Sequence, residues 1–395
     1  MLAAPILTRL YSPNEFGAFA IYLNGVMLIS VIACLRYEMT IVLVKQRRTA
    51  MLLVLACGLI AGLLMLGLWV LIIGFEQTIH TMAGLESESH LLLVLPVSFM
   101  LAALYKISSN WTVRNKDYVG LAISKLWQSL PQTAGQISLG LLHFGVSGLV
   151  IGEIVGRLLG FLTLAVRSRE AFVTPRFTHL CRRVITLLSY YRHYPLYSTW
   201  SALINQAGSV APVFFLAALY GPRTAGLFAL VQRVFALPMD LVGQTASTMY
   251  MAEASHAIRT DIEQLYRIFL RTFLSLLMLA AIPASLLIWS GPPLFDMVFG
   301  HEWYDAGIYA QIVALAYGVR LAISPISQTM QMLGKQKFVL LIETTRLVSI
   351  VGIFACGYLL KSEVEAVLSW YSAILIGFQM WMLLATWQLV KRVKA

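Results

Sequence analysis

Apolar runs of roughly 20 residues recur along the chain, separated by short charged or turn-rich segments. A bilayer core about 30 Å thick needs roughly 20 apolar helical residues, whereas barrel strands would alternate polar and apolar positions over about ten residues. The pattern therefore predicts helices that cross a membrane. Eleven segments qualify: 16–44, 50–74, 90–110, 118–142, 145–166, 196–219, 224–250, 265–289, 304–332, 337–360 and 366–390. Residues 1–7 are apolar but too short to cross, so we expect about 12 transmembrane helices with the first one truncated.

Composition supports this fold class. Hydrophobic residues make up 59% of the chain and charged residues 12%, about half the charged share of a soluble protein. A net charge of +11 would suggest nucleic acid in a soluble protein, but membrane proteins keep Lys and Arg in cytoplasmic loops, so we expect no nucleic-acid partner. The four cysteines, at positions 34, 57, 181 and 356, show no metal-ligand spacing, and no disulfide framework or metal site is expected. The first ten residues lack the charged region and small-residue cleavage site that are typical of a cleavable signal peptide.

The basic residues predict the orientation. If the C-terminus is cytoplasmic, 20 Lys and Arg residues lie on the cytoplasmic side, and only Arg9, Arg223 and Lys361 lie opposite. Cytoplasmic loops are enriched in these residues. We therefore predict a multi-pass protein with a cytoplasmic C-terminus.

An internal repeat divides the chain. Residues 10–20 and 219–229 both read LYxPxxxGxFA, and an even number of predicted spans separates them. The two halves should therefore share one orientation, as in a parallel repeat. We predict an N-terminal six-helix bundle over 1–170 with an incomplete first helix, a basic cytoplasmic linker over 171–193, and a C-terminal six-helix bundle over 194–395.

Apart from those near span ends, ten charged residues fall inside predicted spans, where each costs about 2.5–3.5 kcal/mol at a helix centre. Most should therefore face the bundle interior or a water-filled cavity. The basic ones are Arg36, Lys125, Arg157, Arg233, Arg320 and Arg346, and the acidic ones are Glu38, Glu153, Asp240 and Glu343. Arg233 and Arg320 have no opposite charge within one turn, and a free guanidinium suits a phosphate or pyrophosphate.

Local spacing suggests a structural alternative for some of these charges. Glu153 and Arg157 are four residues apart and Glu343 and Arg346 three apart, so each pair can share a helix face as an ion pair. Lys125 can snorkel to the cytoplasmic edge. Arg36 and Glu38, two residues apart, should point in different directions.

Polar stripes at helical spacing extend the candidate cavity. Their members are Ser198, Ser201, Asn205 and Ser209; Lys125, Gln128, Gln132 and Gln136; and Arg320, Ser324, Ser327 and Gln331. Hydroxyl and amide groups on a wet wall could bind sugar hydroxyls. The alternative is that these small polar side chains hold helices together.

Several short motifs, spread over nearly the whole chain, resemble those of a known transporter family. They are PILTRLYSP (5–13) with Phe16-Gly17, LRYE (35–38), YPLYS (194–198), LFAL (227–230) running into QRV (232–234) and LP (237–238), and FGHEW (299–303). With these motifs the chain resembles bacterial O-antigen and lipopolysaccharide flippases. These are polysaccharide transporters of the multidrug/oligosaccharidyl-lipid/polysaccharide exporter superfamily.

The resemblance implies two six-helix bundles around a central cavity. It further implies a flippase, not an enzyme, that moves a polyprenyl-pyrophosphate-linked oligosaccharide to the periplasmic leaflet of the bacterial inner membrane by alternating access. This cargo would be an O-antigen, capsule or exopolysaccharide repeat unit. Its expected partners are the lipid-linked oligosaccharide, membrane lipid, and polysaccharide polymerase and chain-length proteins, with no cofactor. The six basic residues, with Asn205 and Gln128, would bind pyrophosphate and sugar, and the four carboxylates could couple transport to an ion gradient.

Three alternatives stay open. A drug/cation antiporter of the same superfamily should have a site dominated by carboxylates and aromatics, whereas basic residues predominate here. An envelope polysaccharide polymerase should present a large outward loop, but the longest loop on that side spans only about 75–90. A non-transporting scaffold is the third alternative, should the first helix be missing.

Overall fold

The computed structural model describes residues 3–74, 90–169, 180–260 and 262–394, and within these ranges it is helical with no strand. The first half comprises α1 (Ala4–Leu10), α2 (Pro13–Ser30), the 3₁₀ helix η1 (Tyr37–Met39), α3 (Thr40–Leu43), α4 (Arg47–Gly74), α6 (His90–Arg114), α7 (Tyr118–Leu141), α8 (Gly145–Arg167) and α9 (Leu180–Tyr190). The second half comprises the π-helix η3 (Tyr194–Ser198), α10 (Thr199–Tyr220), α11 (Pro222–Pro238), the π-helix η4 (Met239–Gly243), α12 (Gln244–Thr260), α13 (Ile262–Phe299), the 3₁₀ helix η5 (His301–Trp303), α14 (Tyr304–Met332), α15 (Gln336–Leu359) and α16 (Val364–Lys394). The predicted all-α class is confirmed.

Nine helical stretches in the described ranges are long and apolar enough to cross a membrane, and the chain is a multi-pass membrane protein. They match nine of the eleven predicted spans. The other two, 16–44 and 118–142, are helical in α2 and α7 but are not among those nine. Polar residues such as Asn24 and Gln132 lower the mean hydropathy of these two helices. The predicted count of twelve is therefore not confirmed.

The predicted span 16–44 is wrong as a single helix, because α2 ends at Ser30. Leu35 and Arg36 have left-handed backbone angles, with φ of 49° and 63°, which a right-handed helix cannot contain. Hydrogen bonds between residues three apart, such as Leu35 N–H to the Ile32 carbonyl at 2.9 Å, replace the α-helical bonds between residues four apart. Helical structure resumes in the short helices η1 and α3, which precede α4.

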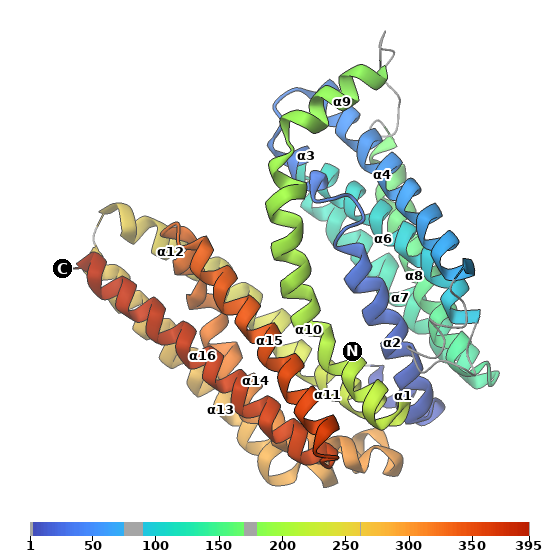
Figure 1. Ribbon diagram of the computed structural model, residues 1–395, viewed down its shortest axis with the longest axis vertical. Helices are drawn as coiled ribbons and strands as arrows, with labels where there is room; N and C mark the ends of the chain where they lie inside the picture. The colour runs from blue at the N-terminus through green and yellow to red at the C-terminus, as the bar shows by residue number, and fades with distance from the viewer. Residues whose placement is uncertain (1–2, 75–89, 170–179, 261, 395) are drawn as a thin grey trace. The chain divides into compact units, whose positions relative to one another are not determined.

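The chain forms two compact units (Figure 1). The N-terminal unit comprises residues 14–210, and the C-terminal unit comprises residues 1–13 and 211–395. In the N-terminal unit α6 packs against α4 and α8, and in the C-terminal unit α14 packs against α13 and α16. Each unit has its own apolar core, one around Phe99, Ile107 and Trp111 and one around Tyr250 and Phe269. The predicted bundle and linker boundaries stay a prediction.

The sequence repeat marks equivalent helix starts. α2 begins at Pro13 and α11 at Pro222, each preceded by the repeated Leu-Tyr pair. Proline suits the first helical turn because its missing N–H would have no helical partner there. Gly221, with φ of 89°, provides a backbone conformation before α11 that favours glycine.

α1 belongs to the C-terminal unit although it is the first helix of the chain. It packs against α13, and the buried Trp303 of η5 donates its Nε1–H to the Thr8 carbonyl at 2.9 Å. This carbonyl lies in the last turn of α1, where helices leave carbonyls without helical partners. The indole therefore caps the end of α1.

Replacing Trp303 by Phe should loosen α1, because the Thr8 carbonyl then loses its buried donor. One such bond contributes about 1 kcal/mol, so exchange of the α1 amides should be about fivefold faster. Hydrogen–deuterium exchange over residues 4–10 measures this. Trp381→Phe, on α16 of the same unit, is the control and should leave those amides unchanged. Equal exchange in wild type and Trp303→Phe would contradict the capping role.

Candidate functional site

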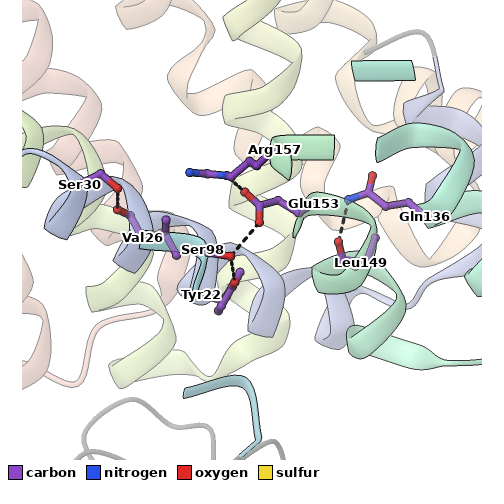
Figure 2. A network of polar contacts seen from close by, with 8 residues as sticks. All are labelled: Tyr22, Val26, Ser30, Ser98, Gln136, Leu149, Glu153 and Arg157. Carbon is purple, nitrogen blue, oxygen red and sulfur yellow. Dashed lines mark hydrogen bonds and ion pairs between the residues drawn. The ribbon is translucent and has the colours of Figure 1, made fainter. Parts of the chain in front are cut away.

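A buried polar network joins three helices of the N-terminal unit (Figure 2). Tyr22 of α2 and Ser98 of α6 have their hydroxyl oxygens 2.5 Å apart. Ser98 donates to Glu153 Oε2 of α8 at 3.2 Å. The other oxygen of Glu153 accepts from Arg157 Nε, one turn further along α8. The predicted Glu153–Arg157 pair is confirmed, and it neutralises a carboxylate that is only 2% exposed.

Arg157 keeps donors beyond this pair. A guanidinium has five N–H donors, and in the described part of the chain only Nε of Arg157 has a hydrogen-bond partner. Its side chain is 14% exposed. The arginine could therefore bind an anion through its terminal nitrogens without breaking its bond to Glu153.

Three glutamines of the α7 stripe, Gln128, Gln132 and Gln136, pack against glycines of α8. Gln136 Nε2 donates to the Leu149 carbonyl at 3.0 Å (Figure 2). A Cβ placed at Gly156 would lie 2.5 Å from both the Gln128 carbonyl and Gln132 Cβ. These contacts are those of two closely packed helices. They agree with the second interpretation of the stripe, in which its side chains hold helices together instead of lining a cavity. The proposed role of Gln128 in substrate binding stays a prediction.

A second charged cluster lies where α2 ends. Lys106 Nζ of α6 donates to the Ser30 carbonyl at 2.8 Å, and an ammonium is favourable at the negative end of a helix. Arg36 is half-buried and its Nε donates to Ser198 Oγ at 3.5 Å. Glu38 is 2% exposed, and its Oε2 has no hydrogen-bond partner among the described residues. Lys106 lies inside α6 beside this cluster.

A third cluster lies in the C-terminal unit. Tyr317 of α14 lies within interaction range of Gln232 of α11 and Tyr371 of α16, and its ring stacks on Phe235 with centroids 4.7 Å apart. Arg320, one turn along α14, lies within electrostatic range of both tyrosines. The cluster thus draws polar groups from three helices.

α15 adds an ion pair to this third cluster. Arg346 Nη2 lies 2.5 Å from Glu343 Oε2, as predicted from their spacing, although the two atoms are not aligned as a hydrogen bond. Arg346 also lies within electrostatic range of Arg320. Among the described residues, Arg320 has no ion-pair partner. Arg320 thus adds a positive charge near the Glu343–Arg346 pair, and a net positive charge favours an anionic ligand.

The other predicted site residues are placed as follows. Arg233 is half-buried on α11 and makes no ion pair with any described residue, whereas Lys125 on α7 and Asn205 on α10 are exposed. Asp240 belongs to η4, but its side chain lies outside the described residues. Arg320 and Arg346 lie within electrostatic range of each other, and the structure does not place Arg233 in their cluster. Within the described ranges no three His, Cys, Asp or Glu side chains gather as a metal site would require.

Comparison with known proteins gives consistent results. The family described as "polysaccharide biosynthesis protein" matches residues 6–307. The succinoglycan biosynthesis transport protein ExoT of Rhizobium meliloti is 24% identical over 373 residues, which cover 93% of this chain and 72% of ExoT. The lipid II flippase MurJ in an inward closed conformation has a similar fold, with a TM-score of 0.79, 15% identity and coverage of 97% of this chain and 85% of MurJ. An inward-facing multidrug transporter of the MATE family has a TM-score of 0.74 at 11% identity, covering 100% of this chain and 96% of the other.

Proposed function

The chain belongs to the polysaccharide biosynthesis protein family, and on that premise we propose that it is a flippase, a transporter rather than an enzyme, for a lipid-linked oligosaccharide. Within this proposal the cargo is a polyprenyl-pyrophosphate-linked sugar repeat unit. The transport function named for ExoT supports this proposal, and the fold that the chain shares with MurJ is compatible with it. The bacterial inner membrane is the location that fits such a cargo.

The observation that carries the proposal is the uncompensated arginine of α14. Arg320 has no ion-pair partner among the described residues and lies near a second arginine, Arg346. A cation inside a membrane segment is costly unless a partner or ligand balances it. A pyrophosphate provides that balance and can accept the paired donors of a guanidinium.

The orientation, the individual ligand residues and the partners that we propose rest on the sequence. The distribution of Lys and Arg supports a cytoplasmic C-terminus. Arg36, Arg157 and Arg233 are further candidates for the pyrophosphate, and Gln128, Asn205 and Lys125 for the sugars. Glu38, Glu153, Asp240 and Glu343 are candidates for ion coupling in an alternating-access cycle. O-antigen is one class of cargo that fits, and polymerase and chain-length proteins are the partners such a cargo would require.

The antiporter alternative rests on one observation, the similar fold of MATE transporters. At 11% identity this likeness concerns the fold alone. The family match and the arginine cluster favour an anionic lipid-linked cargo over a drug cation.

The test is a flipping assay in proteoliposomes that contain a polyprenyl-pyrophosphate lipid with a fluorescent sugar. An impermeant quencher reports how much of the label reaches the outer leaflet. We expect the protein to exchange the labelled lipid between leaflets many times faster than protein-free liposomes do. A phospholipid with the same label should not move. Export of a cationic dye without movement of the pyrophosphate lipid would support the antiporter instead, and covalent lengthening of the sugar would support a polymerase.

A further inference from the structure

The helix α9 (Leu180–Tyr190) lies outside the membrane-crossing stretches. The span that ends at Arg167 and the span that begins at Tyr194 flank it in the chain, so α9 belongs to the segment that joins these two spans on one side of the membrane. Figure 1 shows α9 running across the end of α4, and the two helices are in contact. An orientation across the ends of spans is that of a helix at the membrane interface.

One face of α9 is fixed on the N-terminal unit. Leu187, Leu188 and Tyr191 pack against the apolar core that contains Ile107 and Trp111. The buried Tyr37 donates its hydroxyl to the Leu188 carbonyl at 3.0 Å. These contacts determine which side chains of α9 point away from the protein.

The opposite side carries both basic and apolar groups. Arg182 and Arg192 are exposed, as are Ile185, at 67%, and Tyr190, at 76%. We call these four residues the α9 face. An exposed Ile and Tyr beside arginines is a costly arrangement in water, but it suits the headgroup region, where apolar side chains insert and cations meet phosphates.

The segments next to this face contain few acidic residues. There is no Asp or Glu between residues 171 and 239 or between residues 39 and 75, the segment that contains the start of α4, and Glu38, which adjoins the second range, is buried. Three further exposed cations, Lys45, Arg47 and Arg48, lie just before and at the start of α4. The turn that carries Lys45 is held by Arg114, whose Nη2 donates to the Val44 and Lys45 carbonyls at 2.8 and 2.9 Å. The charged side chains of these two segments are therefore all basic.

We infer that the α9 face binds the headgroups of anionic phospholipids in the adjoining leaflet. Arg182 and Arg192 contact the phosphates, and Ile185 and Tyr190 insert beside the glycerol and upper acyl region. The site is distinct from the arginine cluster of α14 and α15, and it recognises resident lipid rather than transported cargo.

The test uses the whole protein in nanodiscs of neutral phosphatidylcholine, with or without about one third phosphatidylglycerol. Hydrogen–deuterium exchange over residues 182–192 reports the opening of α9. We expect the anionic lipid to slow exchange, and high salt to reverse much of the effect. Because a basic residue near an anionic surface contributes about 1 kcal/mol, Arg182→Gln with Arg192→Gln should remove about 30-fold of that protection.

A matched control removes two exposed charges elsewhere. Lys335→Gln with Lys337→Gln changes the net charge equally and should leave exchange of α9 unchanged. Equal exchange in neutral and anionic nanodiscs would overturn the inference, as would an equal loss of protection in the control. Protection that appears only when a polyprenyl-pyrophosphate lipid is added would also overturn it, since the occupant would then be the cargo.

Discussion

Replacing Arg320 by Gln is expected to reduce transport of a pyrophosphate-linked lipid by more than about 100-fold. A hydrogen bond to a charged group contributes about 1.5–3 kcal/mol, and glutamine cannot replace two such bonds between guanidinium and phosphate. Since Arg320 has no ion-pair partner among the described residues, removing it should leave no stranded carboxylate. Expression and thermal stability should therefore stay near those of the wild type.

Two variants sharpen this experiment. Arg320→Lys keeps the charge but loses the planar fork, so it should retain part of the activity. Arg223→Gln removes an exposed arginine that lies 3.5 Å from Asp305 and should transport normally. Initial rates in the proteoliposome assay compare all four proteins. Full activity of a well-expressed Arg320→Gln variant would remove this residue from the site and weaken the proposal that pyrophosphate binds there.

A single methyl group at Gly156 is expected to destabilise the N-terminal unit by about 1–3 kcal/mol, the range for overpacked interiors. The added Cβ would lie 2.5 Å from the Gln128 carbonyl and 3.2 Å from Gln132 Cα, both on the backbone of α7. Backbone atoms cannot rotate away as a flexible side chain does. α7 and α8 must therefore separate, and the bond from Gln136 to the Leu149 carbonyl should weaken with them.

Gly62→Ala is the matched control, because nothing lies within 4 Å of a Cβ at that position of α4. Alanine has the higher helix propensity, so this variant should be as stable as the wild type or slightly more stable. Denaturant titration in detergent gives the unfolding free energy of both variants. If Gly156→Ala proves as stable as Gly62→Ala, the close contact between α7 and α8 does not contribute as described.

The sequence predicted the interactions that depend on local spacing. Glu153 and Arg157 form a pair because four residues make about one helical turn, and Glu343 and Arg346 do so at a spacing of three. Nine of the eleven predicted spans followed from the lengths of the apolar runs. Each of these inferences needs only the geometry of one helix.

Interactions between helices escaped prediction. Nothing local to Lys106 indicates that its ammonium ends on the Ser30 carbonyl, 76 residues earlier in the chain. The chain leaves α2 through left-handed angles at Leu35 and Arg36, two residues that do not favour such a conformation. The close packing of α7 and α8, in contrast, has a visible signal, since Gly152, Gly156 and Gly160 repeat every four residues as in other tightly packed membrane helices.

The bond between Trp303 and Thr8 has a consequence for the order in which the protein is made. The two residues are 295 positions apart, so at about 5–20 residues per second the ribosome adds Trp303 about 15–60 s after Thr8. During that interval α1 exists without the η5 residue that caps it. The C-terminal unit, to which α1 belongs, therefore cannot finish assembling from the second half of the chain alone. A fragment that begins after α1 would lack one of its helices, and adding residues 1–13 as a separate peptide should restore it.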